Sequence, residues 1–192
     1  MTLPQFFTPP YPVVRLSPKA EARAVRHGFP WVYAGELVMD RRTSNLLPGA
    51  FAVLEDSERR PMAVVTVNPQ SKIVARVLDQ DPAAVIDEDW IAARLARALA
   101  HREALFDEPF YRLVHAEADG LPGVVIDRMG DLAVVQPNAA WSEAMAPTGR
   151  CWRQGLEKQR LISIWFGCRQ PPFLKNRRRA GASFRHSGQG SL

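Results

Sequence analysis

The sequence predicts an α+β protein that begins with a small β-barrel-like unit and continues as a helix and a β-hairpin. Three observations support this prediction. Short apolar runs separated by turn residues fill the first unit, a long helical pattern covers 90–106, and two apolar runs around a turn mark a hairpin at 122–136. We therefore expect a first unit over 13–80, a second over 83–142 and an irregular basic tail over 143–192.

The first unit is predicted from its turns and its β-favouring residues. The run that starts at Val13 reads as a strand that ends before Pro18, and Lys19–Gly28 is rich in helix formers with a glycine at its end. Further strand-like runs lie at 50–54, 61–67 and 72–78. The last two are joined by Asn68–Ser71, a typical turn sequence. Strands separated by turns, with one short helix inserted, indicate a small or partly open barrel.

The second unit is predicted from one helix and one hairpin. Three acidic residues, Asp87–Asp89, precede the helix, and Arg and His lie toward its end, as the helix macrodipole favours. The hairpin strands centre on Val124–Ile126 and Leu132–Val135, and Asp127–Asp131 between them has the polar and glycine content of a tight turn.

The net positive charge of the chain comes from its last part. The whole chain has 25 Lys and Arg against 20 Asp and Glu, yet residues 150–192 hold 10 of the basic residues and one acid, Glu157. The preceding residues are therefore net acidic. From Cys168 onward Pro, Gly, Ser and Arg dominate without a sustained period, which predicts disorder.

Several classes of protein are disfavoured by composition. No apolar run approaches the length that crosses a bilayer, and the N-terminus lacks the pattern of a secretory signal, so we expect a cytoplasmic protein without membrane partners. The two cysteines, Cys151 and Cys168, have sixteen residues between them and no histidine at ligand spacing. They predict neither a zinc site nor a disulfide framework, and we expect no metal.

Three stretches, in this order and spacing, resemble one enzyme family. They are "HGFPWVYAGEL" at 27–37, "VNPQSKIVARVL" at 67–78 and "YRLVHAEADGLPGVVIDRMGDLAVVQ" at 111–136. They look like landmarks of a bacterial family of class I methyltransferases that use S-adenosylmethionine to methylate C5 of a cytosine in large-subunit ribosomal RNA. The resemblance covers about 13–142. It implies that the first unit is an RNA-binding PUA-like pseudo-barrel and that the second is a connector domain.

The resemblance also implies a Rossmann-like catalytic domain after the connector, and the sequence past residue 142 shows no glycine-rich strand-to-helix turn followed by an acid. We therefore predict no cofactor-binding and no catalytic residues in this chain, which reads as truncated before that domain. "CRQPPF" at 168–173 weakly resembles a catalytic element of such enzymes, but Gln170 replaces its acid. We hypothesise a frameshift near residues 144–150 as the reason why the resemblance stops there, and a natural basic extension that contacts RNA phosphates is the alternative.

Candidate RNA contacts come from the PUA-like segment. Arg and Lys bind phosphates, and exposed aromatic side chains stack on unpaired bases. The candidates are Arg26, His27, Trp31, Tyr33, Asn68, Ser71, Lys72 and Arg76. Arg76 is the preferred contact, whereas Trp31 also fits a core position and Asn68 also fits a structural turn.

A second cluster, His115, Glu117 and Asp119, precedes the hairpin. Strand alternation places all three side chains on one face, where they fit acid–base chemistry or, as we prefer, a solvated strand edge.

Three functions fit these observations. The first is the RNA-binding part of a ribosomal RNA cytosine-C5 methyltransferase, inactive alone. The second is a free-standing PUA-type RNA-binding protein with a basic tail, and the third is a fragment complemented by a separately encoded catalytic domain. In each the partner is RNA, with ribosomal RNA preferred, and apolar residues of the connector hairpin favour self-association.

Overall fold

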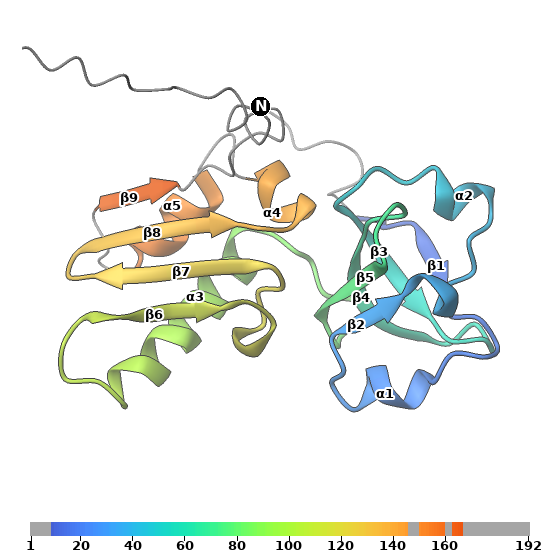
Figure 1. Cartoon of the computed structure of the whole chain (residues 1–192), viewed down its shortest axis with the longest axis horizontal. Coiled ribbons are helices and arrows are strands. Elements are labelled where there is room, and N and C mark those ends of the chain that lie inside the picture. The colour runs from blue at the N-terminus through green and yellow to red at the C-terminus, as the bar shows by residue number, and fades with distance from the viewer. Residues whose placement is uncertain (1–8, 146–149, 160–162, 167–192) are drawn as a thin grey trace, which may run out of the picture.

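The computed structural model describes residues 9–145, 150–159 and 163–166, which form two units lying side by side (Figure 1). The first unit is built on a five-stranded sheet and the second on a four-stranded sheet. This confirms the predicted mixed α+β architecture. None of the described helices is long and apolar enough to cross a membrane.

The first unit contains five strands and three short helices among the described residues. They are β1 (Val13–Arg15), α1 (Ala22–Arg26), β2 (Trp31–Tyr33), the 3-10 helix η2 (Ala34–Glu36), α2 (Arg41–Ser44), β3 (Ala50–Glu55), β4 (Pro61–Val67) and β5 (Ile73–Asp79). The sheet has the order β1-β3-β4-β5-β2 and curls into a half-barrel (Figure 1). β1 runs parallel to β3, and the other neighbours are antiparallel.

The central strands of this sheet are apolar on both faces. In β4, Ala63 and Val65 pack inside the half-barrel, whereas Val64 points the other way, into the core of the second unit. Phe51 of β3 and Leu78 of β5 join that second core as well. A strand covered on both faces needs a continuous apolar run rather than alternation, which explains the sequence of β4.

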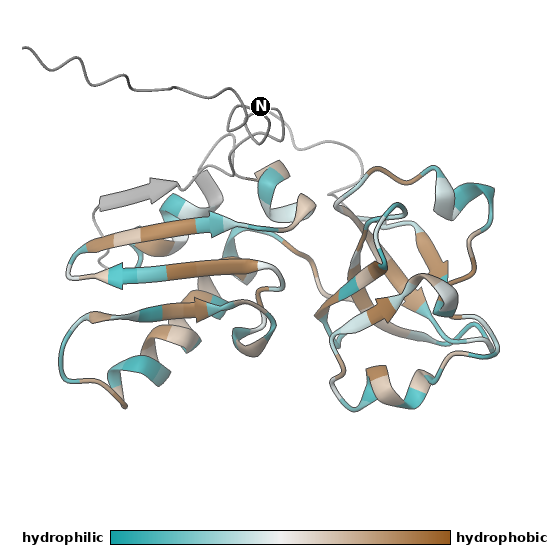
Figure 2. Ribbon diagram, in the orientation of Figure 1, coloured by the Kyte–Doolittle hydropathy of each residue, from teal (hydrophilic) through white to brown (hydrophobic). Residues whose placement is uncertain are grey.

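The second unit packs helices against one face of its sheet. Its elements are α3 (Glu88–Glu103), β6 (Phe110–His115), the 3-10 helix η3 (Ala116–Asp119), β7 (Val124–Met129), β8 (Leu132–Pro137), α4 (Ala140–Met145), α5 (Arg150–Glu157) and β9 (Ser163–Phe166). The strand order is β6-β7-β8-β9, with β9 parallel to β8 and the others antiparallel. Figure 2 shows the hydrophobic residues that run along β7 and β8.

A close backbone approach joins the two units. Gly49, just before β3, has φ +91°, and a Cβ placed there would lie 2.7 Å from the backbone of Ala140 and Trp141. Glycine both adopts this left-handed conformation and leaves room for α4. Next to this contact the ring of Phe51 lies 6.3 Å from the ring of Trp141.

The predicted helix and hairpin are present with shifted bounds. The helix spans 88–103 rather than 90–106. Its start lies at Glu88 because the Asp87 carboxylate accepts a hydrogen bond from the backbone N–H of Trp90. The hairpin strands run three and two residues further than the apolar runs suggested, over 124–129 and 132–137, so the predicted turn at Asp127–Asp131 is shortened to Gly130 and Asp131.

The prediction of an irregular segment over 143–192 is wrong for three stretches, the first of which is the end of α4 at 143–145. Residues 150–157 form α5, and residues 163–166 form β9. Trp152 and Leu156 are fully buried, and a Cβ at Gly155 would lie 2.8 Å from Leu95 of α3. Apolar residues at helical spacing on the face toward α3 account for this packing. The disorder predicted for 168–192 lies outside the described residues.

Candidate functional site

The predicted RNA contacts fall into two groups on adjacent strands. Arg26, His27, Trp31 and Tyr33 lie on or after α1 and on β2, and Asn68, Ser71, Lys72 and Arg76 lie on the β4–β5 turn and β5. Antiparallel pairing of β2 with β5 sets Trp31 opposite Arg76. The structure thus brings the two groups to neighbouring places, although they are far apart in sequence.

Two residues of the first group, Trp31 and Tyr33, border a hollow between α1 and β2, which we call the aromatic hollow. Its volume is about 270 Å³. It is lined by Leu16, Ala20, Glu21, Ala24, Val25, Phe29, Trp31, Val32, Tyr33 and Glu36. Phe29 and Tyr33 are 42% and 41% exposed, so ring faces remain accessible to a ligand. Phe29 packs edge-on against Trp31 at 6.1 Å between ring centroids.

The two arginines of α1 differ in whether they form an ion pair with a buried carboxylate. Arg26 forms an ion pair with Asp56 at 2.5 Å, and Arg60 contacts the same carboxylate at 2.8 Å. Hydrogen bonds from the backbone and side chain of Arg60, together with those from Glu58 and Arg26, outweigh burial and hold the pKa of Asp56 well below its usual range. Arg23 is exposed and contacts His27 at 3.4 Å. Sequence reasoning missed Arg23 and Phe29, although both lie beside residues it selected.

Two predicted residues hold the units together. The carboxylate of Glu117, in η3, accepts a hydrogen bond from Trp31 Nε1 at 2.8 Å and pairs with Arg76 Nη1 at 2.5 Å. Burial alone would raise the pKa of Glu117, but hydrogen bonds from Trp31 and the backbone and the charge of Arg76 outweigh it, so that the pKa is lowered. We call this contact the Glu117 clasp.

A second clasp repeats the same chemistry with the roles of the units exchanged. Asp79, at the end of β5, accepts from Trp90 Nε1 at 2.7 Å and from Arg94 Nη2 at 2.6 Å, both on α3. The Arg94 guanidinium lies 4.8 Å from the Trp90 ring centroid, and the Arg76 guanidinium lies 5.9 Å from that of Trp31. Each clasp therefore combines a carboxylate, an indole N–H and a stacked guanidinium.

The second group borders a cavity between the units, which we call the interunit cleft. Its volume is about 310 Å³. Residues of both units line it: Gly49, Thr66, Val67, Asn68, Ser71, Ile73 and Arg76 from the first, and Asn138, Ala139, Ala140, Trp141 and Glu143 from the second. Lys72 is exposed and does not line the cleft. Asn68 also serves its turn, because its backbone carbonyl accepts from the N–H of Ser71 at 3.0 Å.

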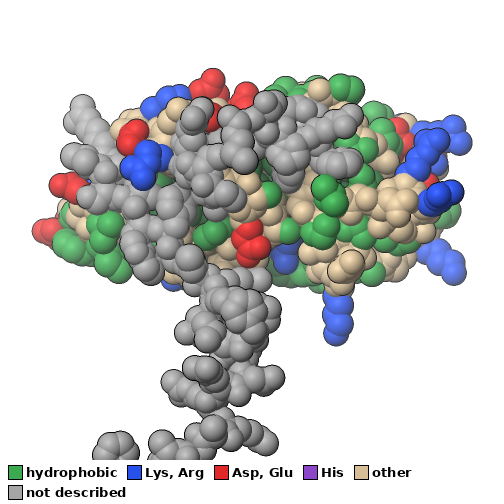
Figure 3. All heavy atoms as spheres, turned by 90° about the horizontal axis from the view of Figure 1, so that it is seen from above, with side chains coloured by type: hydrophobic (Ala, Val, Ile, Leu, Met, Phe, Trp, Pro, Cys, Tyr) green, Lys and Arg blue, Asp and Glu red, His purple; other side chains and the backbone are tan. Residues whose placement is uncertain are grey.

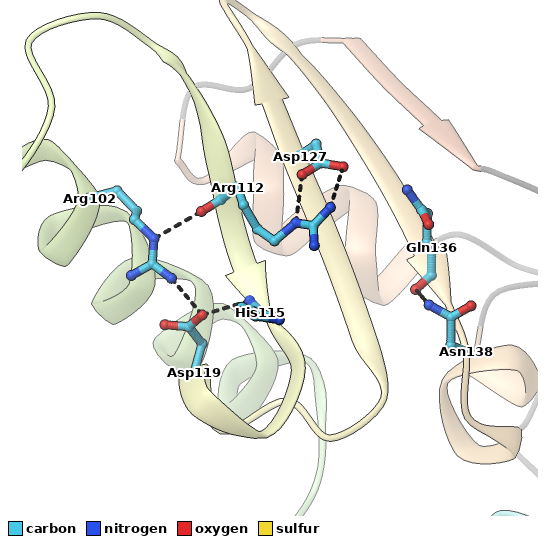
Figure 4. A network of polar contacts seen from close by, with 7 residues as sticks. All are labelled: Arg102, Arg112, His115, Asp119, Asp127, Gln136 and Asn138. Atoms are coloured by element: carbon cyan, nitrogen blue, oxygen red, sulfur yellow. Dashed lines mark hydrogen bonds and ion pairs between the residues drawn. The ribbon is translucent and has the colours of Figure 1, made fainter.

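The His115 cluster has a structural role in part, and its predicted geometry is wrong. β6 ends at His115 and η3 follows, so the alternation that would place Glu117 and Asp119 on one face stops there. Asp119 accepts from the backbone N–H of His115 at 2.6 Å and from Arg102 at 2.7 Å (Figure 4). Glu117 instead reaches the first unit, as described above.

The open face of the second sheet is polar in its middle. Arg112 of β6 donates to Asp127 of β7 across the strands at 2.9 Å (Figure 4).

Figure 3 shows Lys and Arg side chains gathered at the end of the molecule that holds the first sheet. No group of three or more potential ligand side chains able to hold a metal ion occurs in the described part of the chain.

Comparison with known proteins identifies the first unit. Residues 14–80 match the model of a PUA-like domain, which confirms the predicted PUA-like fold of this unit. Over 136 residues the chain is 38% identical to a ribosomal RNA large subunit methyltransferase of Deinococcus radiodurans. This alignment covers 67% of this chain and 33% of that protein. The chain is 33% identical over 132 residues to ribosomal RNA large subunit methyltransferase I of Cronobacter sakazakii, with the same coverage.

Solved structures agree on the fold. A "putative sam-dependent methyltransferase" from Streptococcus mutans aligns with a TM-score of 0.63 at 16% identity, over 81% of this chain and 40% of that one. A methyltransferase structure complexed with SAH aligns with a TM-score of 0.60 over 39% of its length. The chain thus contains a PUA-like domain, is homologous to ribosomal RNA large subunit methyltransferases, and spans about a third of the curated relatives it matches.

Proposed function

We propose that this chain binds RNA through its PUA-like unit and that ribosomal RNA is its target. The observation that carries the proposal is the aromatic hollow, where Phe29 and Tyr33 present exposed rings and which borders α1, the helix that carries the exposed Arg23. Aromatic faces next to cations suit unpaired bases and their phosphates. The PUA-like match and the ribosomal RNA methyltransferase relatives support the same substrate class.

The rings of the hollow and the cations elsewhere in the first unit have separate tasks in this proposal. Tyr33 and Phe29 stack on bases, and each such contact is worth about 1–3 kcal/mol. Arg23, His27 and Lys72 contact phosphates, so affinity falls steeply as salt rises. Arg26 acts mainly through its ion pair with the buried Asp56, which positions α1.

The reaction served by this binding is, in our proposal, methylation of C5 of a cytosine in large-subunit ribosomal RNA. The described residues do not fit the methyl donor. A dinucleotide-type or S-adenosylmethionine-type site uses a glycine-rich turn between a strand and a helix, followed by an acid. The lining of the aromatic hollow contains no glycine, and that of the interunit cleft contains only Gly49, which packs against α4. We therefore assign RNA binding, and no catalytic step, to the described residues.

The alternative is an RNA-binding protein whose basic C-terminal residues supply most of the affinity, and the charge of residues 150–192 favours it. A deletion that separates the two has to keep α5 and β9, since Trp152 and Leu156 are buried in the core. The informative comparison is the chain with and without residues 167–192.

The test is a filter-binding titration at several salt concentrations with a structured ribosomal RNA fragment and an unrelated RNA of equal length. We expect tighter binding to the ribosomal fragment, and we expect this preference to survive deletion of 167–192. A preference that disappears with the deletion supports the alternative. If neither RNA binds, the proposed function is wrong.

A further inference from the structure

The interunit cleft has a lining that the PUA-like domain alone does not provide. One wall is the β4–β5 turn with Asn68 and Ser71, and the other is formed by Asn138, in the β8–α4 connection, and by Glu143 of α4. These walls face each other because Gly49 lets α4 approach β3 and because the two clasps fix the units. The cleft therefore exists only when both units are assembled.

Several side chains that line the cleft are of the types that contact nucleobase edges. The amides of Asn68 and Asn138 both donate and accept, and the hydroxyl of Ser71 does the same. Asparagine amides and carboxylates are typical partners of the amino groups and ring nitrogens of bases. Glu143 at the cleft disfavours a second phosphate there and suits an exocyclic amino group.

Arg76 adds a fixed cation to the cleft. A guanidinium carries five N–H donors. In the part of the chain that the structure describes, the side-chain hydrogen-bond partner of Arg76 is Glu117, which holds Nη1. The ring of Trp31 lies on one side at 5.9 Å. The guanidinium is therefore oriented by the second unit while part of it lines the cleft, as a preformed phosphate contact requires.

The size of the cleft selects among RNA forms. A volume of about 310 Å³ is at the small end of ligand pockets, which span about 300–1,000 Å³. A base pair within a duplex does not enter a cavity of this size, whereas one nucleotide that has left the stack does.

We propose that the interunit cleft binds a single unstacked nucleotide of the RNA, with its phosphate on Arg76 and its base edge on Asn68, Ser71 and Asn138. This inference rests on the proposed function that the chain binds RNA. It goes further by assigning a base contact to Asn138, which lies outside the PUA-like domain. Both units then contact the RNA, and their fixed orientation becomes part of recognition.

The experiment measures fluorescence anisotropy with two labelled hairpin RNAs that are identical except for one unpaired nucleotide in the stem. We expect the wild-type chain to bind the bulged hairpin about fivefold or more tightly than the paired one, as one good base contact provides. Asn138→Ala should bring this ratio to about one and leave the affinity for the paired hairpin unchanged. Asn45→Ala, an exposed asparagine of the first unit that lines neither cavity, should behave as wild type.

A second variant guards against a local folding effect, because the Asn138 amide donates to the backbone carbonyl of Gln136 at 3.2 Å. Ser71→Ala changes the opposite wall and should lower the ratio as well. If wild type binds both hairpins equally, or if Asn138→Ala and Ser71→Ala weaken both equally, the inference is wrong while RNA binding stands. If no hairpin binds at all, the proposed function fails.

Discussion

Replacing Glu117 with alanine tests whether the hydrogen bonds of Glu117 to the first unit stabilise the folded protein. The change removes the shared acceptor of Trp31 Nε1 and Arg76 Nη1. Hydrogen bonds to a charged group contribute about 1.5–3 kcal/mol, and a buried donor left unpaired costs about 1–3 kcal/mol. The side chains of Arg76 and Glu117 are 28% and 17% exposed, so water replaces part of the loss. We expect a total cost of about 2–3 kcal/mol.

The assay is urea unfolding at pH 7, followed by tryptophan fluorescence. Glu103→Ala is the matched control, because Glu103 is 57% exposed and its ion pair with Arg128 is long, at 3.4 Å. Exposed pairs of this kind contribute about 0–1 kcal/mol. If Glu117→Ala is no less stable than Glu103→Ala, the clasp does not hold the units and the reasoning is refuted.

The same pair of proteins gives a pH dependence with a definite sign. The pKa of Glu117 is lowered in the folded protein, so its stabilisation is present above the unfolded-state pKa of about 4.3 and is lost as the pH falls through the folded-state pKa. The difference between wild type and Glu117→Ala should therefore be constant from pH 7 to 5 and shrink on further acidification. A difference that grows toward low pH contradicts the clasp.

Three further changes test the packing. Gly49→Ala should destabilise more than Gly28→Ala, because both glycines have φ near +90° but only Gly49 has backbone atoms 2.7 Å from a new Cβ; equal losses would exclude the close approach as the cause. Trp152→Ala should cost about 3–5 kcal/mol in urea unfolding, as a fully buried aromatic does, and an unchanged midpoint would show that α5 does not pack there. Phe110 and Met129 are 69% and 52% exposed, so replacing both with serine should reduce self-association in sedimentation velocity; an unchanged distribution would remove this surface from consideration.

The parts of the fold that sequence predicts well are those with a local signal. The β4 run is continuous because both faces of the strand are covered, and the hairpin is marked by Gly130, which has φ +64° between β7 and β8. The helix start was displaced by two residues because the Asp87 cap is a geometric feature that the apolar period does not report.

The features that could not be predicted from the sequence depend on contacts between segments that are distant in the chain. Glu117 was grouped with His115 and Asp119 by alternation, but β6 ends at His115 and Glu117 pairs with residues 41 and 86 positions away. The role of Asn138 at the interunit cleft likewise needs the β4–β5 turn beside α4. Only the assembled fold supplies such information.

The most direct test of RNA binding at the aromatic hollow is the dissociation constant of one ribosomal RNA fragment for three proteins at the same salt concentration. They are wild type, the double variant Phe29→Ala/Tyr33→Ala, and Leu47→Ala, an exposed apolar residue outside the hollow. We expect the double variant to bind about tenfold or more weakly, since stacking on each ring contributes to affinity, and Leu47→Ala to match wild type. Equal affinity of all three proteins would contradict the assignment of this surface to RNA.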